Sequence, residues 1–104
     1  MVKTEELHVP TRGNNHVLDI TAEVARAVAR SGVRDGTVTV FHVHEQTWHD
    51  DNGHSHVRAS LLGPSLSVPF VEGHLMLGTW QQIILVDFDT HARKRNVICQ
   101  IIGE

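Results

Sequence analysis

The sequence predicts an α+β domain in which one long and one short helix pack on a mostly antiparallel sheet. Three observations support this fold class. Apolar residues recur at helical spacing between Asp19 and Gly32, later segments alternate as strands do, and short turns join most segments after residue 64. Strands joined by short turns run antiparallel. We expect residues 1–104 to form one domain, which is a usual size for a single core.

The composition argues against several classes of protein. The net charge is −3, and lysine and arginine do not gather in one block, so we expect no nucleic-acid partner. No apolar run is long enough to span a membrane, and the first ten residues lack the apolar stretch of a secretory signal. The single cysteine, Cys99, has apolar neighbours. It predicts a buried thiol in a cytoplasmic protein.

The first third of the chain predicts a strand and a helix. Residues 7–16 are typical of a short strand followed by a turn. The helix lies within 19–32, where Asp19 or Thr21 caps its start and Gly32 follows its end. Its apolar stripe, which should pack on the sheet, consists of Ile20, Val24, Ala27, Val28 and Ser31.

A β-branched, alternating segment at 37–44 predicts a strand with two different faces. An inward face that ends in two histidines is unusual. By the period of two, that face carries Val38, Val40, His42 and His44.

The later elements carry more apolar surface than the helices can cover, so we expect part of it to contact another subunit. A loop leads from the strand at 37–44 to a short helix at 54–63, which ends before Pro64. The remaining expected elements are strands at 65–70, at 75–89 with a bend at Gly78, and at 94–102, with turns at 72–74 and 90–93.

Five of the nine histidines fall between residues 42 and 56. Histidine is the commonest metal ligand and titrates near neutral pH. Zinc requires three or four nitrogen, sulfur or carboxylate ligands, which a strand end and the loop after it can supply. The spacing predicts either a site for a divalent metal, zinc or magnesium, or a polar cleft of solvated imidazoles. The candidate metal ligands are His44, His49, His54 and His56.

The segment SHVRASLLGPSLSVPFVEGHLMLGTWQQIILVDFD at 55–89 resembles the YjbQ-like family, whose members are also described as secondary thiamine-phosphate synthases. The shared pattern is a small-residue–His pair that opens a helix, then Leu-Gly-x-Ser, a Val-Pro strand and the block Leu-Gly-Thr-Trp-Gln. Arg93 and Arg95 fit the pattern, and His44 stands where the family has the first residue of a His-Thr-Thr motif. The resemblance covers essentially the whole chain.

Two departures from the family pattern concern the candidate site. Both threonines of the His-Thr-Thr motif are replaced, by Glu45 and Gln46, and the Asn-Glu segment that follows in the family is missing. By this resemblance the chain is a shortened member. Its version of the family's Asp-Gly-Pro-Arg turn is reduced to residues 89–93.

The resemblance implies a homotrimer of α+β subunits with a histidine-lined cleft near the subunit boundary, and weak thiamine-phosphate synthase activity. In such an enzyme His44 or His56 would act as general base or acid, and Asp87 would orient the histidine or bind the metal. A phosphate would suit the entry of the short helix, where free N–H groups favour an anion. The expected ligand-binding residues are Ser60, Gly63, Ser65, Trp80, Gln81 and Arg93.

Two functions from different classes follow from these patterns. One is an enzyme that joins a pyrimidine pyrophosphate to a thiazole phosphate, as the resemblance implies. The other is a non-enzymatic trimer that binds a metal or a small phosphorylated ligand. The chain has no Asp-rich block that would hold magnesium pyrophosphate, which counts against the first.

Overall fold

Seven strands and one helix form the part of the chain that the computed structural model describes, which comprises residues 1–11, 16–43, 65–87 and 93–104. Every strand pairing in it is antiparallel, which confirms the expected mostly antiparallel sheet with a helix packed on it. In chain order the elements are β1 Val2–Thr11, β2 His16–Asp19, α1 Thr21–Ser31, β3 Gly36–His42, β4 Ser65–Val71, β5 His74–Leu75, β6 Ile84–Asp87 and β7 Arg93–Gly103.

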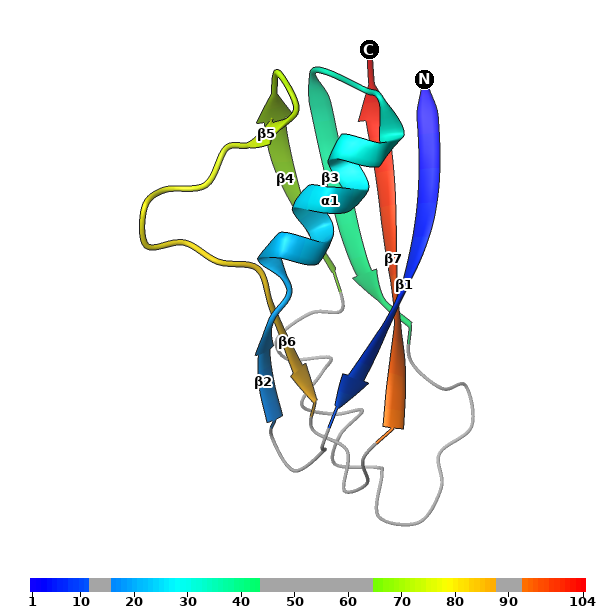
Figure 1. Ribbon diagram of the computed structural model, residues 1–104, viewed down its shortest axis with the longest axis vertical. Coiled ribbons are helices and arrows are strands. Elements are labelled where there is room, and N and C mark those ends of the chain that lie inside the picture. Colours follow the sequence, from blue (N-terminus) through cyan, green and yellow to red (C-terminus); the bar gives the residue numbers. More distant parts are fainter. Residues whose placement is uncertain (12–15, 44–64, 88–92) are drawn as a thin grey trace.

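The main sheet has the strand order β1-β7-β3-β4-β5, so β7 lies between the first strand and β3 (Figure 1). Gly36 and Gly103 face each other in the β3–β7 ladder. A Cβ atom added at either glycine would lie 2.0 Å from a carbonyl oxygen of the opposing segment. The two segments approach so closely there that only glycine fits, which helps to fix the register of β7 against β3.

Helix α1 ends before Gly32 as the sequence predicts, but its N-cap residue is Ile20, which makes no side-chain capping bond, rather than Asp19 or Thr21. The N–H of Thr21 donates a hydrogen bond of 2.9 Å to Oδ1 of Asp19, which satisfies one of the free donors of the first turn. Hydrogen bonding to the side chain of Thr21, and then to its backbone N–H, holds the pKa of the exposed Asp19 carboxyl below its usual range. Gly32 ends the helix in the left-handed region at φ 75°. Near the other end of α1, Nε of Arg30 donates to Oε1 of Glu5 on β1 at 2.8 Å.

The buried apolar side chains form one cluster on the side of the main sheet that α1 covers (Figure 1). Each strand contributes alternate residues to this covered face, because side chains of a strand point to opposite faces in turn. The predicted stripe of α1 packs here, with Ser31 half-buried at its end. The buried members from α1 and the main sheet are Val9, Val24, Ala27, Val28, Val38, Val40, Val68, Phe70, Val97, Cys99 and Ile101.

The turn expected at 72–74 joins β4 to β5. Glu72 has φ 51° and Gly73 has φ 78°, and two successive residues with positive φ match the twist of a tight hairpin. The N–H of Glu72 also donates to Oδ1 of Asp35 at 2.9 Å, which ties the turn to the start of β3. Pro69 lies in β4, whose outer side pairs with the two residues of β5 and accepts one bond of 2.9 Å from the N–H of Met76 to the carbonyl of Pro69. A strand that is paired so little on one side tolerates proline.

The prediction of one long strand at 75–89 is wrong. β5 ends at Leu75, β6 begins at Ile84, and the loop between them projects from the body of the molecule (Figure 1). The N–H of Gly78 donates to Oε1 of Gln81 at 2.7 Å, and the N–H of Gln81 donates to the carbonyl of Gly78 at 3.0 Å. These two bonds close a tight turn. The sequence pattern did not predict it, because the residues on either side are apolar as in a strand.

The chain returns from this loop by bonding to the start of α1. The N–H of Ile20 donates to the carbonyl of Ile83 at 2.9 Å, and the N–H of Ile83 donates to Oγ1 of Thr21 at 2.8 Å. From this anchor β6 runs antiparallel to β2 as a separate two-stranded ribbon. The sequence patterns did not predict this strand pair.

Other expected boundaries differ by a few residues or cannot be compared. The first strand begins at Val2 rather than Leu7, and the strand expected at 37–44 ends at His42. The short helix expected at 54–63 lies outside the described residues. Among the helical residues that the structure describes, none form a helix long and apolar enough to cross a bilayer.

Replacing Thr21 with Val should remove the hydroxyl that accepts the N–H of Ile83 and leave that donor without its protein partner. A buried donor without a partner costs about 1–3 kcal/mol, and we expect a loss of that size in the free energy of unfolding. Urea unfolding followed by circular dichroism measures it. Thr21→Ser keeps the hydroxyl and should retain most of the stability. Equal losses in the two variants would show that the hydroxyl does not matter.

Burial raises the pKa of the Cys99 thiol to about 11, because the thiolate is poorly solvated in the core. The thiol should therefore react with an alkylating reagent at pH 8 at least about 100-fold more slowly in the native protein than in urea, where its pKa is ordinary. Mass spectrometry of timed samples measures the two rates. Similar rates in both states would contradict the burial of Cys99.

Candidate functional site

Two antiparallel ladders end at the lower end of the molecule in Figure 1. The β1–β7 ladder ends with Thr11 opposite Arg93, and the β2–β6 ribbon ends with His16 opposite Asp87. We call these four residues the strand-end region. Both ladders contribute side chains to the same buried core, which holds them together. Two residues that the sequence singled out, Asp87 and Arg93, therefore have their backbones at the same end of the fold.

His16 is a candidate that the sequence interpretation missed. It is the register partner of Asp87, although the two residues lie far apart in the sequence. Aspartate and histidine are the residue types that form carboxylate–imidazole pairs in catalytic and metal sites. No local pattern marks His16, because its position follows only from the pairing of β2 with β6.

The end of β3 leads toward the histidine-rich segment. His42, half-buried, is the last residue of β3, and the N–H of Val43 donates to the carbonyl of Asn96 on β7 at 3.0 Å. Asn96 is three residues along β7 from Arg93, a distance of about 10 Å in a strand. The chain therefore leaves the sheet toward residues 44–64 about 10 Å from the strand-end region.

Most of the predicted metal and catalytic residues cannot be placed. Their roles stay predictions, because the structure does not describe residues 44–64. Within the ranges that it does describe, no group of three or more His, Cys, Asp and Glu side chains could hold a metal ion. The residues outside the described part are His44, His49, His54, His56, Ser60 and Gly63.

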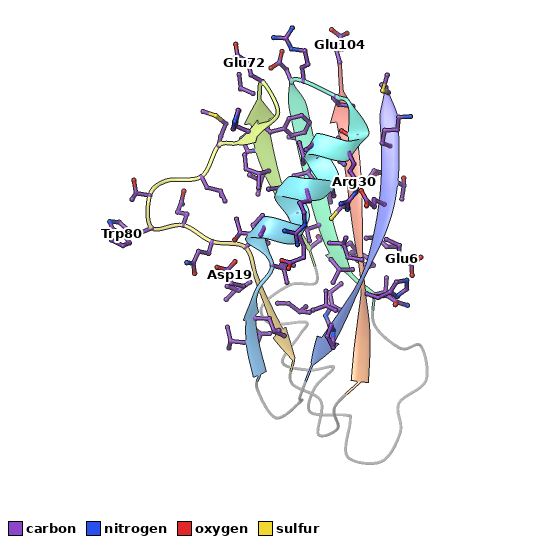
Figure 2. All side chains as sticks on the ribbon, in the orientation of Figure 1. Glu6, Asp19, Arg30, Glu72, Trp80 and Glu104 are labelled. Atoms are coloured by element: carbon purple, nitrogen blue, oxygen red, sulfur yellow. The ribbon has the colours of Figure 1, made fainter. Side chains whose placement is uncertain are left out.

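Ser65, Trp80 and Gln81 are described, and they do not meet at the strand-end region. Ser65 is the first residue of β4, exposed and opposite Phe41 of β3. Trp80 is 93% exposed at the tip of the loop between β5 and β6, and it points away from the body of the chain (Figure 2). Oε1 of Gln81 accepts the N–H of Gly78 inside that turn. The ligand-binding roles expected for these three residues stay predictions.

The strand-end region has the residue types of an anion and proton-transfer site. Arginine presents several donors in a fixed planar arrangement that matches a phosphate, and aspartate beside histidine can hold or exchange a proton near neutral pH. Because Arg93 and Asp87 end different ladders, their backbone positions depend on the packing of the two ladders rather than on a flexible loop.

Comparison with known sequences places the chain in a family. A family model described as UPF0047 protein YjbQ-like matches residues 42–104. A UPF0047 protein from Methanothermobacter thermautotrophicus is 30% identical over 135 residues, which cover 99% of this chain and 94% of that protein. Since this chain has 104 residues, the alignment contains gaps in it. A UPF0047 protein YjbQ from Salmonella typhimurium is 43% identical over 54 residues, 52% of this chain and 39% of that protein.

Solved structures share the fold. A YbjQ-like protein of unknown function from Sulfolobus solfataricus P2 superposes with a TM-score of 0.89 at 28% identity, over 100% of this chain and 99% of that one. A hypothetical protein from Aeropyrum pernix K1 gives a TM-score of 0.86 at 28% identity, over 98% of this chain and 99% of that one. These matches confirm the resemblance seen in the Leu-Gly-Thr-Trp-Gln block and its surroundings. The chain belongs to the YjbQ-like (UPF0047) family.

Proposed function

We propose that this protein binds a small phosphorylated ligand at the strand-end region. The observation that carries the proposal is the common end of two ladders, where Arg93 begins β7 and Asp87 ends β6 opposite His16. Arg93 supplies the cation for a phosphate, and Asp87 and His16 supply a carboxylate and an imidazole. The three residues come from strands that pack on one core, which favours a preformed site.

The histidine-rich segment completes this site in the proposal. Residues 44–64 follow Val43, whose N–H bonds to Asn96 on the same strand as Arg93. Chain that leaves the sheet about 10 Å from Arg93 can reach the ligand within a few residues. His44, His56, Ser60 and Gly63 are then the further groups that contact the ligand, either directly or through a divalent metal.

Replacing Arg93 with Gln should weaken binding of inorganic pyrophosphate, measured by isothermal titration calorimetry. A hydrogen bond to a charged group contributes about 1.5–3 kcal/mol, so the dissociation constant should rise about 10- to 100-fold. Pyrophosphate serves as the probe because it carries the phosphate chemistry without an organic part. Titrations with and without zinc show whether a metal takes part in the binding.

Arg34→Gln is the matched control for this experiment. Arg34 is exposed and precedes β3 at the opposite end of the sheet, where its N–H donates to the carbonyl of Glu104. The same loss of charge there should leave pyrophosphate affinity within about twofold of the unmodified protein. If the wild-type protein binds no pyrophosphate, or if both variants weaken binding equally, the strand-end region is not the phosphate site.

A second candidate function is a thiamine-phosphate synthase-type reaction, and the position of Asp87 at a ladder end, on the same side of the fold as Arg93, favours it. In this reaction a nitrogen of the thiazole phosphate attacks the methylene carbon of the pyrimidine pyrophosphate, and pyrophosphate leaves with the electron pair of the broken C–O bond. A divalent cation would neutralise the leaving group. His56 or His44 would exchange a proton with the pyrophosphate, and Asp87 would orient the imidazole.

Incubation with both phosphorylated substrates and magnesium should yield thiamine phosphate, detected by chromatography. His56→Ala should lower the rate at least about 100-fold, the usual contribution of a general acid or base. His74→Ala is the control, since His74 is exposed in β5 and has no proposed role. Product that does not exceed the His56→Ala background would refute the enzyme and leave ligand binding as the function.

A further inference from the structure

Strand β3 ends in a histidine that neither proposed function uses. Val38 and Val40, on the side of the sheet that α1 covers, are only 0% and 6% exposed. The next position on that side is His42, which is half-buried and whose Nε2 atom is shielded from solvent. Burying a polar ring costs more desolvation free energy than burying leucine. Residues that cost stability in this way are expected mainly at functional sites.

The register of β7 connects His42 to the strand-end region. His42 is opposite Val97, and the diagonal position, two residues nearer the start of β7, is Arg95. Diagonal neighbours in a sheet lie about 7–8 Å apart, within reach of long side chains. Arg93 is two residues further in the same direction, and the period of two places positions 93, 95 and 97 on one side of the strand. The sheet surface beside His42 therefore continues to the end of the β1–β7 ladder.

The β2–β6 ribbon packs on this same surface. Leu85 of β6 is buried in one cluster with Val97, and Leu18 of β2 packs against that cluster. Asp87 is two residues from Leu85, and His16 is two residues from Leu18, so both positions fall on the ribbon face that carries these leucines. The last residue of β3 therefore lies on the sheet side of one end of the core, and the two ribbon residues lie on the other side.

We propose that His42 is a further ligand-binding residue of the strand-end region, which contacts the bound phosphate from the side of the main sheet. This inference rests on the function proposed above and adds a residue to its site. An imidazole N–H can donate a hydrogen bond to a phosphate oxygen, and such a bond is stronger where water is excluded. Because β3 is the central strand of the main sheet, its backbone holds the ring more firmly than a loop would.

The charges near His42 fit an anion better than a cation. Two arginine positions, Arg93 and Arg95, lie on its side of β7, and the ribbon contributes one carboxylate position, Asp87. The balance of charge therefore attracts an anion. In the part of the chain that the structure describes, His42 belongs to no group of three or more side chains that could hold a metal ion.

His42→Leu tests the inference, because leucine has a similar size and suits the apolar neighbours. We expect the variant to unfold at the same urea concentration as the unmodified protein or at a higher one. It should bind inorganic pyrophosphate at least about 10-fold more weakly in isothermal titration calorimetry. A residue that only packs in the core would not separate the two measurements in this way, since its loss would change stability and leave affinity unchanged.

His74→Leu is the matched control, because it makes the same substitution at an exposed residue of β5 and should leave the affinity within about twofold. His42→Gln keeps a side-chain donor and should recover part of the affinity. If His42→Leu does not fold, NMR of the unmodified protein takes its place. The ring nitrogen signals of His42, assigned as those that His42→Gln lacks, should then shift when pyrophosphate is added.

The possible results separate this inference from the function on which it rests. If Arg93→Gln weakens pyrophosphate binding but folded His42→Leu does not, or if the His42 ring signals stay unchanged, His42 is not a binding residue and the strand-end site remains. If the unmodified protein binds no pyrophosphate, both proposals are wrong. Equal weakening by His74→Leu and His42→Leu would also overturn the role of His42.

Discussion

The pairing of β7 with both β1 and β3 holds the rest of the structure in place. Three of the fully buried side chains, Val97, Cys99 and Ile101, come from this strand and lie under α1. β7 is the last strand in the chain, and it lies between β1 and β3. The sheet is therefore complete only when β7 pairs with both of these earlier strands. Long-range pairing of this kind has a large loop-closure cost, which buried apolar surface must offset. At Gly36 and Gly103 the backbones of β3 and β7 lie so close together that no larger residue fits.

The candidate site follows from where these ladders stop. β1 and β7 end their pairing at Thr11 and Arg93, and β2 and β6 end theirs at His16 and Asp87. The core lies behind both pairs, so their backbones are held by packing rather than by the loops that connect them. A ligand site built at such strand ends can vary in its loops while its scaffold stays fixed. This arrangement suits a family whose members differ in length within one fold.

The two faces of the main sheet have different chemistry because α1 covers only one of them. The covered face is aliphatic and meets α1, which is fastened at its start through Asp19 and Ile83 and near its end through Arg30 and Glu5. The opposite face of β3 and β4 has hydroxyl groups between larger apolar side chains. Trp80 is exposed outside the sheet, in the turn that hydrogen bonds between Gly78 and Gln81 close.

Local sequence patterns were enough to predict the main helix and three of the strands. The 3.6-residue period predicted α1 and its end at Gly32, although not its N-cap at Ile20, and alternation predicted β3, β4 and β7. Each of these signals comes from contacts within a few residues, which explains why they could be recognised. Family membership was also visible, because the block around Trp80 is distinctive.

Local patterns did not predict which strands are neighbours, the pairing of β2 with β6, or the turn that interrupts the apolar run after Leu75. These outcomes depend on segments far apart in the chain, and no local pattern encodes them. For the same reason the sequence patterns indicated Asp87 and Arg93 as separate candidates. That His16 lies opposite Asp87 follows from the register of β2 against β6.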